Sequence, residues 1–379
     1  MPRALDFSGY YKFFLILASA LALGGCWPER AFDAWNLLSE IEEASGVGTP
    51  MPDPKAIQRQ IISFKINGIG YAADIYRTSA AQATLVLVPG ATRSGKDDRR
   101  LVAMARALAK AKFSVVVPEI PAMSAFRLSA SDAKPIAAVI RQQAMENKAP
   151  VLLAAVSYAV GPAIVAALDK ETLPYVAGLV AIGGYYDIEE TIGFLTSGCL
   201  RSIAEKWDCR SANPMRWAFA QANAAYLTAA RDRFLLLHAA ERKLAEPEFG
   251  LGEISAAMTS EGKAVLTLLE GHDPSQVSEH IAALPTLMRE NIGELDLKNR
   301  DLTPLRSKHW LIVHGTYDPI IPAAQGQALA QALGGEIILI DNLAHATLNG
   351  GDLSDAFKLW RGVMKLLEMR DNLKVGGVS

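Results

Sequence analysis

Strand-like apolar runs and longer amphipathic segments alternate along most of this chain. Apolar runs of about four to eight residues are typical of parallel strands that are covered on both faces, and such runs occur at 84–88, 113–117, 151–156, 175–182, 309–314 and 336–340. Segments with apolar residues at helical spacing lie between or after them, at 97–112, 131–147, 162–169, 323–333 and 352–368. Ser131 is a candidate N-cap for the second of these helices. This order predicts an α/β fold with a mainly parallel twisted sheet and helices on both faces.

Two further patterns precede this alternation. Residues 60–66 and 71–77 alternate around an Asn-Gly pair, which predicts a β-hairpin. Residues 26–56 contain apolar side chains at helical spacing from 31 to 44, followed by a stretch rich in Pro and Gly. Because Pro and Gly interrupt both regular structures, this region is predicted to be a short amphipathic helix and a linker.

The stretch from 188 to 305 shows no strand rhythm. It is rich in Ala and Leu and carries several Trp, Phe and Tyr residues. We expect it to be mostly helical. It would be inserted into an α/β core that consists of residues 57–187 and 306–379.

The first 25 residues differ from the rest of the chain. A start that carries basic residues precedes an uncharged run at 13–23. This run is shorter than the roughly 20 apolar residues of a membrane-spanning helix and has the length of the apolar region of a secretory signal. Gly24-Gly25-Cys26 follows it and resembles the lipobox of bacterial lipoproteins, in which the cysteine is lipidated. Residues 1–25 are therefore expected to be a lipoprotein-type signal peptide, with an uncleaved N-terminal membrane anchor as the alternative.

Both interpretations export the chain and attach it to a membrane, facing the periplasm. Trp27 follows Cys26 in place of the Asp that resembles an inner-membrane retention signal, which favours the outer membrane. Export would place Cys199 and Cys209 in an oxidising compartment, where they can form a disulfide. Two buried free thiols are the alternative. A zinc site is disfavoured because two cysteines without a nearby histidine cannot complete a tetrahedral shell.

Charge and motif content restrict the partners. The chain has 38 Lys and Arg against 40 Asp and Glu, for a formal net charge of −2. It therefore lacks the basic field that holds phosphate backbones, and we expect no nucleic-acid partner. The sequence contains no phosphate-binding loop, no dinucleotide-binding fingerprint and no cluster with metal-ligand spacing. It therefore predicts neither a cofactor nor a metal.

Ser157 lies between the apolar run at 151–156 and a helical segment. A serine exposed on a sharp turn from strand to helix crowds the residues two positions before and after it, so both must be small. Here both are alanine, Ala155 and Ala159, where glycine is usual. This placement indicates a nucleophile, with a helix-capping serine as the alternative.

Two further polar residues lie just beyond predicted strand ends. Asp318 follows the run at 309–314, and His345 follows the run at 336–340. A carboxylate in such a loop can accept the N–H of a histidine and set its tautomer. The other five histidines fit this role less well, because they lie on a strand or in the helical insertion. Asp187 is the alternative acid, although it more simply caps the helix that follows it.

The order Ser157, Asp318, His345, with each residue just past a strand end, resembles the order in the α/β-hydrolase superfamily. The resemblance covers about residues 58–368. It implies that Ser157 attacks a substrate carbonyl, that His345 takes its proton and returns it to the leaving group, and that Asp318 orients His345. It also implies that the insertion at 188–305 is a helical lid.

Acyl transfer also requires two hydrogen-bond donors for the developing oxyanion. The family resemblance assigns one to the backbone N–H of Tyr158, directly after the nucleophile. The second comes from the loop after the first central strand, where the family commonly has His-Gly and this chain has Pro-Gly-Ala at 89–91. The N–H of Ala91 is the expected donor, with Thr92 next. The polar stretch at 92–98 is either a site for an acidic substrate group or an exposed loop that caps the next helix.

Together these features predict a membrane-tethered serine hydrolase. Its expected substrate is a small-molecule or lipid-like carboxylic ester, or a related acyl compound, cleaved through an acyl-enzyme intermediate. One alternative is a non-catalytic envelope lipoprotein that uses the same fold to bind a lipid or protein partner. Another is a peptidase or an acyltransferase that uses the same three residues.

Overall fold

The computed structural model describes residues 28–44, 57–66, 68–201, 206–271, 273–345, 347–348 and 353–375. The expected signal or anchor segment at 1–25, the expected lipidation site Cys26 and the Pro/Gly linker lie outside the described residues. Within the described ranges, no helix combines the length and the apolar character that crossing a bilayer requires.

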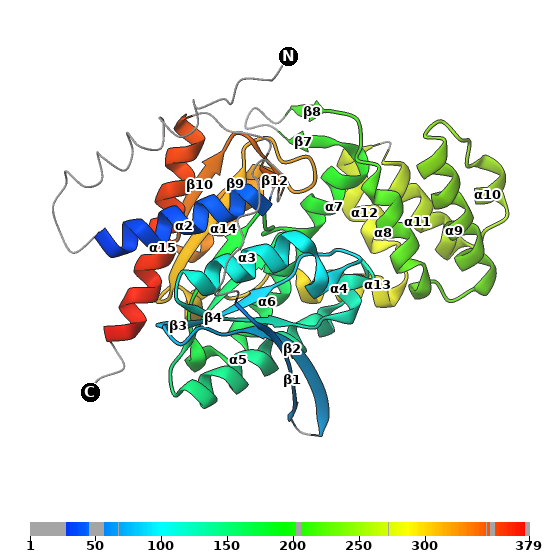
Figure 1. The fold of residues 1–379 in the computed structure, drawn as a ribbon. Helices are drawn as coiled ribbons and strands as arrows, with labels where there is room; N and C mark the ends of the chain where they lie inside the picture. Colours follow the sequence, from blue (N-terminus) through cyan, green and yellow to red (C-terminus); the bar gives the residue numbers. More distant parts are fainter. Residues whose placement is uncertain are drawn as a thin grey trace, which may run out of the picture.

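An eight-stranded sheet forms the centre of the molecule (Figure 1). Its strands stand in the order β1 (Arg59–Ile66), β2 (Ile69–Tyr76), β4 (Phe113–Pro118), β3 (Ala83–Val88), β5 (Val151–Val156), β6 (Val176–Ile182), β9 (His309–Gly315) and β10 (Glu336–Ile340). The pairs β1–β2 and β2–β4 are antiparallel, and all other neighbours in this sheet are parallel. The mainly parallel sheet and the hairpin predicted from the sequence are confirmed.

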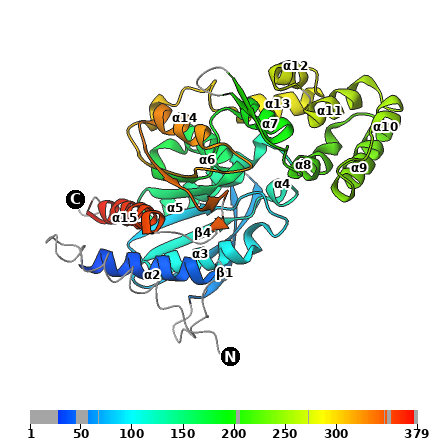
Figure 2. The same cartoon turned by 90° about the horizontal axis from the view of Figure 1, so that it is seen from above.

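Helices cover both faces of the sheet (Figure 2). One face carries α2 (Pro28–Ala44), α3 (Arg99–Lys110) and α15 (Leu353–Val375), and the other carries α5 (Ala133–Asn147), α6 (Val160–Leu168) and α14 (Ala323–Leu333). Successive side chains of a strand point to opposite faces. Leu85 and Leu87 of β3 accordingly pack in one core and Val86 and Val88 in the other. Burial on both faces explains why this strand is a continuous apolar run.

Helix α2 packs against the core through a buried ion pair. Arg370 on α15 donates from Nη1 to Asp33 Oδ2 over 2.7 Å, and both side chains are almost fully buried. Lys112 approaches the same carboxylate at 3.1 Å. Removing one partner of a buried ion pair typically costs about 3–5 kcal/mol. The predicted amphipathic helix is thus present and belongs to the folded body.

The start of α5 differs from the expectation. Residues Ala130–Asp132 form a 3₁₀ turn, and α5 begins at Ala133. The Ser131 hydroxyl hydrogen-bonds the Ser129 hydroxyl at 2.7 Å and caps no backbone N–H. The prediction of Ser131 as the N-cap is therefore wrong, because the turn before the helix uses this side chain locally.

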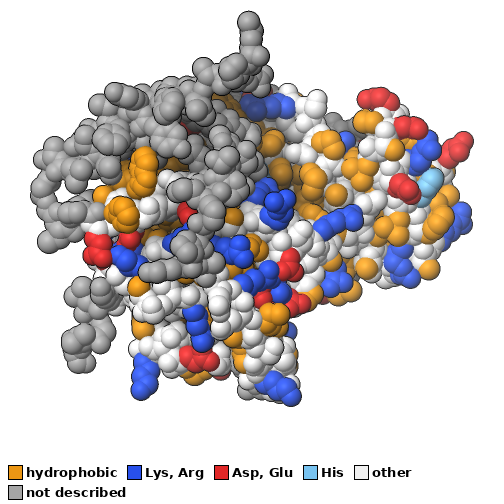
Figure 3. Space-filling view, in the orientation of Figure 1, with side chains coloured by type: hydrophobic (Ala, Val, Ile, Leu, Met, Phe, Trp, Pro, Cys, Tyr) orange, Lys and Arg blue, Asp and Glu red, His pale blue; other side chains and the backbone are white. Residues whose placement is uncertain are grey.

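A mostly helical insertion joins β6 to β9 and projects to one side of the sheet (Figure 1), as the sequence predicts. Its helices are α7 (Ile188–Ser197), α8 (Met215–Asn223), α9 (Ala230–Ala245), α10 (Gly252–Ala256), α11 (Ser260–Glu270), α12 (Val277–Ala282) and α13 (Thr286–Leu295). A short hairpin of β7 (Cys199–Arg201) and β8 (Trp207–Cys209), which the sequence pattern did not predict, interrupts them. Figure 3 shows hydrophobic and charged side chains interspersed over this face of the insertion.

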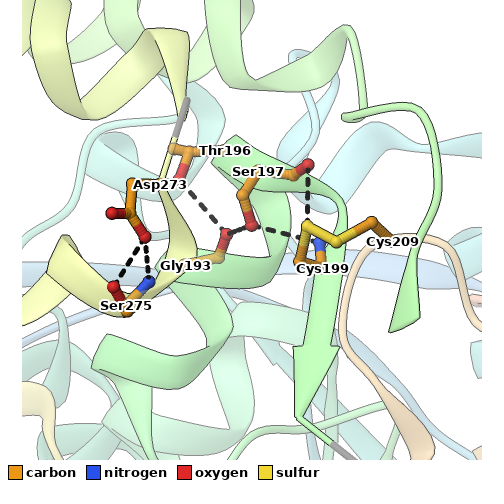
Figure 4. Close-up of a disulfide and its surroundings, with 7 residues drawn as sticks. All are labelled: Gly193, Thr196, Ser197, Cys199, Cys209, Asp273 and Ser275. Carbon is orange, nitrogen blue, oxygen red and sulfur yellow. Dashed lines mark hydrogen bonds between the residues drawn. A yellow bond between two sulfur atoms is a disulfide. The ribbon is translucent and has the colours of Figure 1, made fainter. Parts of the chain in front are cut away.

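A disulfide closes the hairpin between Cys199 and Cys209, which stand opposite each other in the strand register (Figure 4). The Ser197 hydroxyl links this hairpin to α7. It accepts the Cys199 N–H at 3.1 Å and donates to the Gly193 carbonyl at 2.7 Å. The disulfide expected from the two cysteines is therefore present, and it lies directly after α7.

Replacing both cysteines with serine is expected to lower the free energy of unfolding by about 3 kcal/mol. A cross-link over a loop of about ten residues removes conformational entropy from the unfolded chain. Chemical denaturation of the oxidised wild type and of C199S/C209S measures the difference. Wild type reduced with dithiothreitol should behave like the double variant, and equal stability of all three samples would contradict the prediction.

Candidate active site

Ser157 occupies a strained turn at the end of β5. Its φ of +59° lies in the left-handed region that non-glycine residues seldom adopt. It begins a 3₁₀ turn, Ser157–Ala159, that leads directly into α6. Ala155 and Ala159, on either side, are fully buried. Small residues at these two positions therefore let the turn pack closely while Ser157 remains partly exposed.

Gly161 allows α6 to lie close to the loop after β6. A Cβ placed on Gly161 would lie 1.8 Å from the hydroxyl oxygen of Tyr185. The Tyr185 hydroxyl donates to the Leu295 carbonyl at 3.1 Å. This buried phenol thus joins the helix after Ser157 to the end of α13 in the insertion.

Three side chains from three strand ends form one hydrogen-bonded chain. His345 Nε2 lies 2.6 Å from Ser157 Oγ, and His345 Nδ1 lies 2.9 Å from Asp318 Oδ2. The Asp318 side chain is fully buried, whereas His345 is 18% exposed. With Nδ1–H donating to the carboxylate, Nε2 is left as the acceptor of the Ser157 hydroxyl proton. The structure therefore brings together the three residues that the sequence placed beyond β5, β9 and β10.

The Asp318 carboxylate is held by its own loop. Its Oδ1 accepts the backbone N–H groups of Ile320 and Ile321, at 2.8 and 3.0 Å. His314 supports the same loop, because its Nε2–H donates to the Ile321 carbonyl at 2.9 Å. Burial lowers the pKa of His314, so this imidazole is neutral at neutral pH. His314 is therefore a structural residue beside the site.

Asp187, the alternative acid, is bound elsewhere. It is the N-cap of α7, where its Oδ1 accepts the Glu190 N–H at 2.9 Å. Its Oδ2 pairs with Lys298 at 2.8 Å. In the described part of the chain, no hydrogen bond joins it to His345. The geometry therefore places Asp318, not Asp187, against the imidazole.

The segments expected to supply oxyanion donors flank Ser157. A Cβ placed on Gly90 would lie 3.8 Å from Ser157 Cβ, so the loop that continues to Ala91 runs beside Ser157. Tyr158 is the second residue of the 3₁₀ turn. The first N–H groups of a helix lack helical acceptors. Its backbone N–H is therefore available to a substrate oxygen.

Charged side chains of the polar stretch at 92–98 stabilise the fold. Lys96 pairs with the buried Asp74 at 3.1 Å, and Asp97 pairs with Arg59. Asp98 caps α3 by accepting a backbone N–H at 3.0 Å. These contacts fit the capping-loop interpretation of this stretch better than a substrate site.

The Tyr158 side chain reaches a buried carboxyl group. Its hydroxyl oxygen accepts the Ser129 N–H at 3.0 Å and donates to Asp132 Oδ2 at 3.4 Å. Burial raises the pKa of Asp132 to about 7, although the hydrogen bond from Tyr158 opposes this shift. Sequence reasoning used only the backbone of Tyr158 and missed Asp132, which carries no motif.

A cavity of about 170 Å³ extends from Ser157 beneath the insertion. Its lining comes mainly from α7, α8, α11 and α13 and is largely aliphatic and aromatic, for example Ile188, Ile192, Leu195, Phe219, Leu268 and Met288. Arg216 is the one charged residue among the described lining residues. Sequence reasoning missed it, although a helical spacing places Arg216, Ala220 and Asn223 on one face of α8. In the described residues, no group of three His, Cys, Asp or Glu side chains could hold a metal ion.

Comparison with known proteins agrees with this architecture. The sequence model of the alpha/beta hydrolase family matches residues 85–352, more than half of the chain. Among solved structures, the chain is similar to an acylaminoacyl peptidase from Pyrococcus horikoshii and to an esterase domain from a Rhodothermus marinus protein. The peptidase is 13% identical with a TM-score of 0.49, over 84% of this chain and 42% of its own. The esterase domain is 14% identical with a TM-score of 0.44, over 81% of this chain and 97% of its own.

The chain thus spans less than half the length of the peptidase. No curated protein matches the sequence. The family match runs from within β3 to the residues just before α15, and so covers the insertion and every strand of the sheet except β1 and β2. It also contains Ser157, Asp318 and His345. The chain belongs to the alpha/beta hydrolase family.

Proposed function

We propose that this protein is a serine hydrolase that cleaves a carboxylic ester, or a related acyl bond, through an acyl-enzyme intermediate. The observation that carries the proposal is the hydrogen-bonded chain from Asp318 through His345 to Ser157, with links of 2.9 and 2.6 Å. Ser157 also lines a largely apolar cavity. A protein that only binds a partner has no need of this alignment, which argues against the non-catalytic alternative.

Each residue has one role in the proposed reaction. Ser157 Oγ attacks the carbonyl carbon while His345 Nε2 takes its proton. The N–H groups of Tyr158 and Ala91 stabilise the negative charge that develops on the carbonyl oxygen. His345 then protonates the leaving alcohol. In the second half of the reaction His345 takes a proton from water, which attacks the acyl carbon; the bond to Ser157 Oγ breaks, and His345 returns the proton to that oxygen as the acid is released. Asp318 keeps the imidazole in the required tautomer and stabilises its charged form.

The largely apolar lining of the cavity is complementary to an apolar substrate. Most of its lining belongs to the insertion, so we propose that the insertion acts as the lid of the site. The peptidase and acyltransferase alternatives share the same first step. An assay with several acceptors therefore has to separate them.

We also propose that the protein is exported and attached to a membrane through its N-terminus. The motivating features are the signal-like first 25 residues and the cysteine at position 26. The Cys199–Cys209 disulfide supports an oxidising compartment. Labelling with a radioactive fatty acid, lost in a Cys26→Ser variant, tests the attachment; equal labelling of both would contradict it.

A fluorophosphonate probe should label the folded wild type at Ser157, and Ser157→Ala should abolish the labelling. The variant should also lower kcat on p-nitrophenyl esters by at least about a thousandfold, because the nucleophile is lost. Ser278→Ala, at an exposed serine on α12, is the matched control and should label normally. Esters of increasing acyl length, peptide amides and alcohol acceptors assayed together identify the reaction. Absence of labelling in folded wild type would overturn the proposal.

Asp318→Asn is expected to lower kcat by about 10³–10⁴-fold, because an amide cannot hold the charged imidazole or its tautomer. Asp187→Asn is the matched control. It should cost at most about 1 kcal/mol of stability through the lost ion pair with Lys298 and leave kcat within a few-fold of wild type. Steady-state kinetics and chemical denaturation of both variants measure these effects. A large loss of kcat in Asp187→Asn together with near-normal kcat in Asp318→Asn would identify Asp187 as the acid instead.

Asp132 is expected to make stability fall with rising pH. Its pKa is about 7 in the folded protein and about 3.9 in an unfolded chain, so the folded state binds the proton more tightly. This contribution is fully present below about pH 4 and is lost as the pH rises through 7; it amounts to at most about 4 kcal/mol. Denaturation of wild type and Asp132→Asn at pH 5 and pH 8 measures it. An unchanged pH dependence in the variant would contradict the assignment.

A further inference from the structure

One cation in the wall of the cavity has no carboxylate partner among the described residues. Nε and Nη1 of Arg216 are buried and have no hydrogen-bond partner among the described residues. Its guanidinium carbon lies 5.6 Å from the centroid of the Trp217 ring. Burial lowers the pKa of Arg216, with no contribution from a nearby carboxylate. An arginine remains charged even so.

Several other buried or half-buried cations among the described residues are paired with carboxylates. Arg370 contacts Asp33 and Asp371, and Lys96 contacts Asp74. Burying a charge without a partner is costly, which is why such groups are rare in folded proteins. Arg216 therefore differs from these paired cations. A negatively charged ligand can supply the partner that the described residues around Arg216 do not.

The helix that carries Arg216 is held against the active site at both ends. Asn213, just before α8, donates from Nδ2 to the Pro319 carbonyl, next to Asp318, at 3.1 Å. Asn223, at the end of α8, accepts the Leu128 N–H at 2.8 Å. The position of the guanidinium relative to Ser157 is thus set by contacts on both sides of the cavity.

We propose that Arg216 binds a carboxylate of the substrate. The rest of the cavity lining is predominantly apolar, and Ser157 belongs to the same lining. A matching substrate is an ester with an apolar body and a carboxylate at the end remote from the bond that is cleaved. A planar carboxylate fits the guanidinium, since two parallel N–H···O bonds can form. The hydrolysis by Ser157 belongs to the proposed function, and this inference rests on it. The binding of the carboxylate by Arg216 rests on the cavity alone.

The first measurement compares two series of p-nitrophenyl esters of equal acyl length. One series ends in a carboxylate, as in hemiesters of dicarboxylic acids, and the other ends in a methyl group. Wild type should prefer the carboxylate series by at least about tenfold in kcat/KM, because a charge-assisted bond contributes roughly 1.5–3 kcal/mol. In Arg216→Met, which keeps the length but not the charge, the preference should disappear. Arg216→Lys, which keeps the charge but not the planar fork, should give an intermediate ratio.

Arg231→Met, at an exposed arginine on α9, is the matched control and should retain the wild-type preference. A wild-type enzyme that hydrolyses both series equally, or an Arg216→Met variant that retains the preference, would overturn the inference.

The second measurement needs no turnover. Ser157→Ala protein is titrated with a medium-chain dicarboxylic monoester and with the corresponding diester, and binding is followed by calorimetry. Tighter binding of the monoester, lost when Arg216→Met is added, supports the anion site even if no ester is hydrolysed; in that case only the proposed hydrolysis fails. Hydrolysis of esters together with equal binding of both compounds would overturn the anion site and leave the proposed function standing.

Discussion

The Asp318 carboxylate holds two parts of the candidate active site in place at once. Its Oδ1 accepts two backbone N–H groups of the loop after β9, and its Oδ2 accepts Nδ1–H of His345 from the loop after β10. Because this carboxylate is removed from solvent, its hydrogen bonds act in a low dielectric and are strong. The distance from His345 to Ser157 therefore depends on loop geometry organised around one buried charge.

The same loop also supports the wall of the cavity. Pro319, the residue after Asp318, accepts a hydrogen bond from Asn213 at the start of α8. The hydroxyl of Tyr185, packed against Gly161 behind the nucleophile, bonds to the end of α13. The insertion is thus fastened to the reacting groups from two directions. The wall of the cavity and the residues of the candidate active site therefore share supporting contacts.

Much of the fold could be predicted because strands buried on both faces must be continuously apolar, as β3 and β5 are. Ser157, Asp318 and His345 could be placed because parallel strands end at one edge of the sheet. The position of Arg216 in the cavity wall could not be predicted, because the sequence pattern of an amphipathic helix does not show which element its apolar face will contact. The environment of Asp132 was likewise hidden, because its burial arises from packing against Tyr158, which is distant in sequence.

Helix α2 begins at Pro28, a single residue after Trp27, whereas the Pro/Gly stretch lies on its far side. This helix is part of the rigid body through Asp33 and Arg370. A lipid on Cys26 would therefore be joined to the body with almost no slack, since one residue extends at most about 3.6 Å. The Pro/Gly stretch follows α2 in the sequence and so lies outside the connection between Cys26 and the helix. Such a protein would lie on the bilayer in a restricted set of orientations, and the height of its catalytic serine above the lipid would be set by the dimensions of the fold.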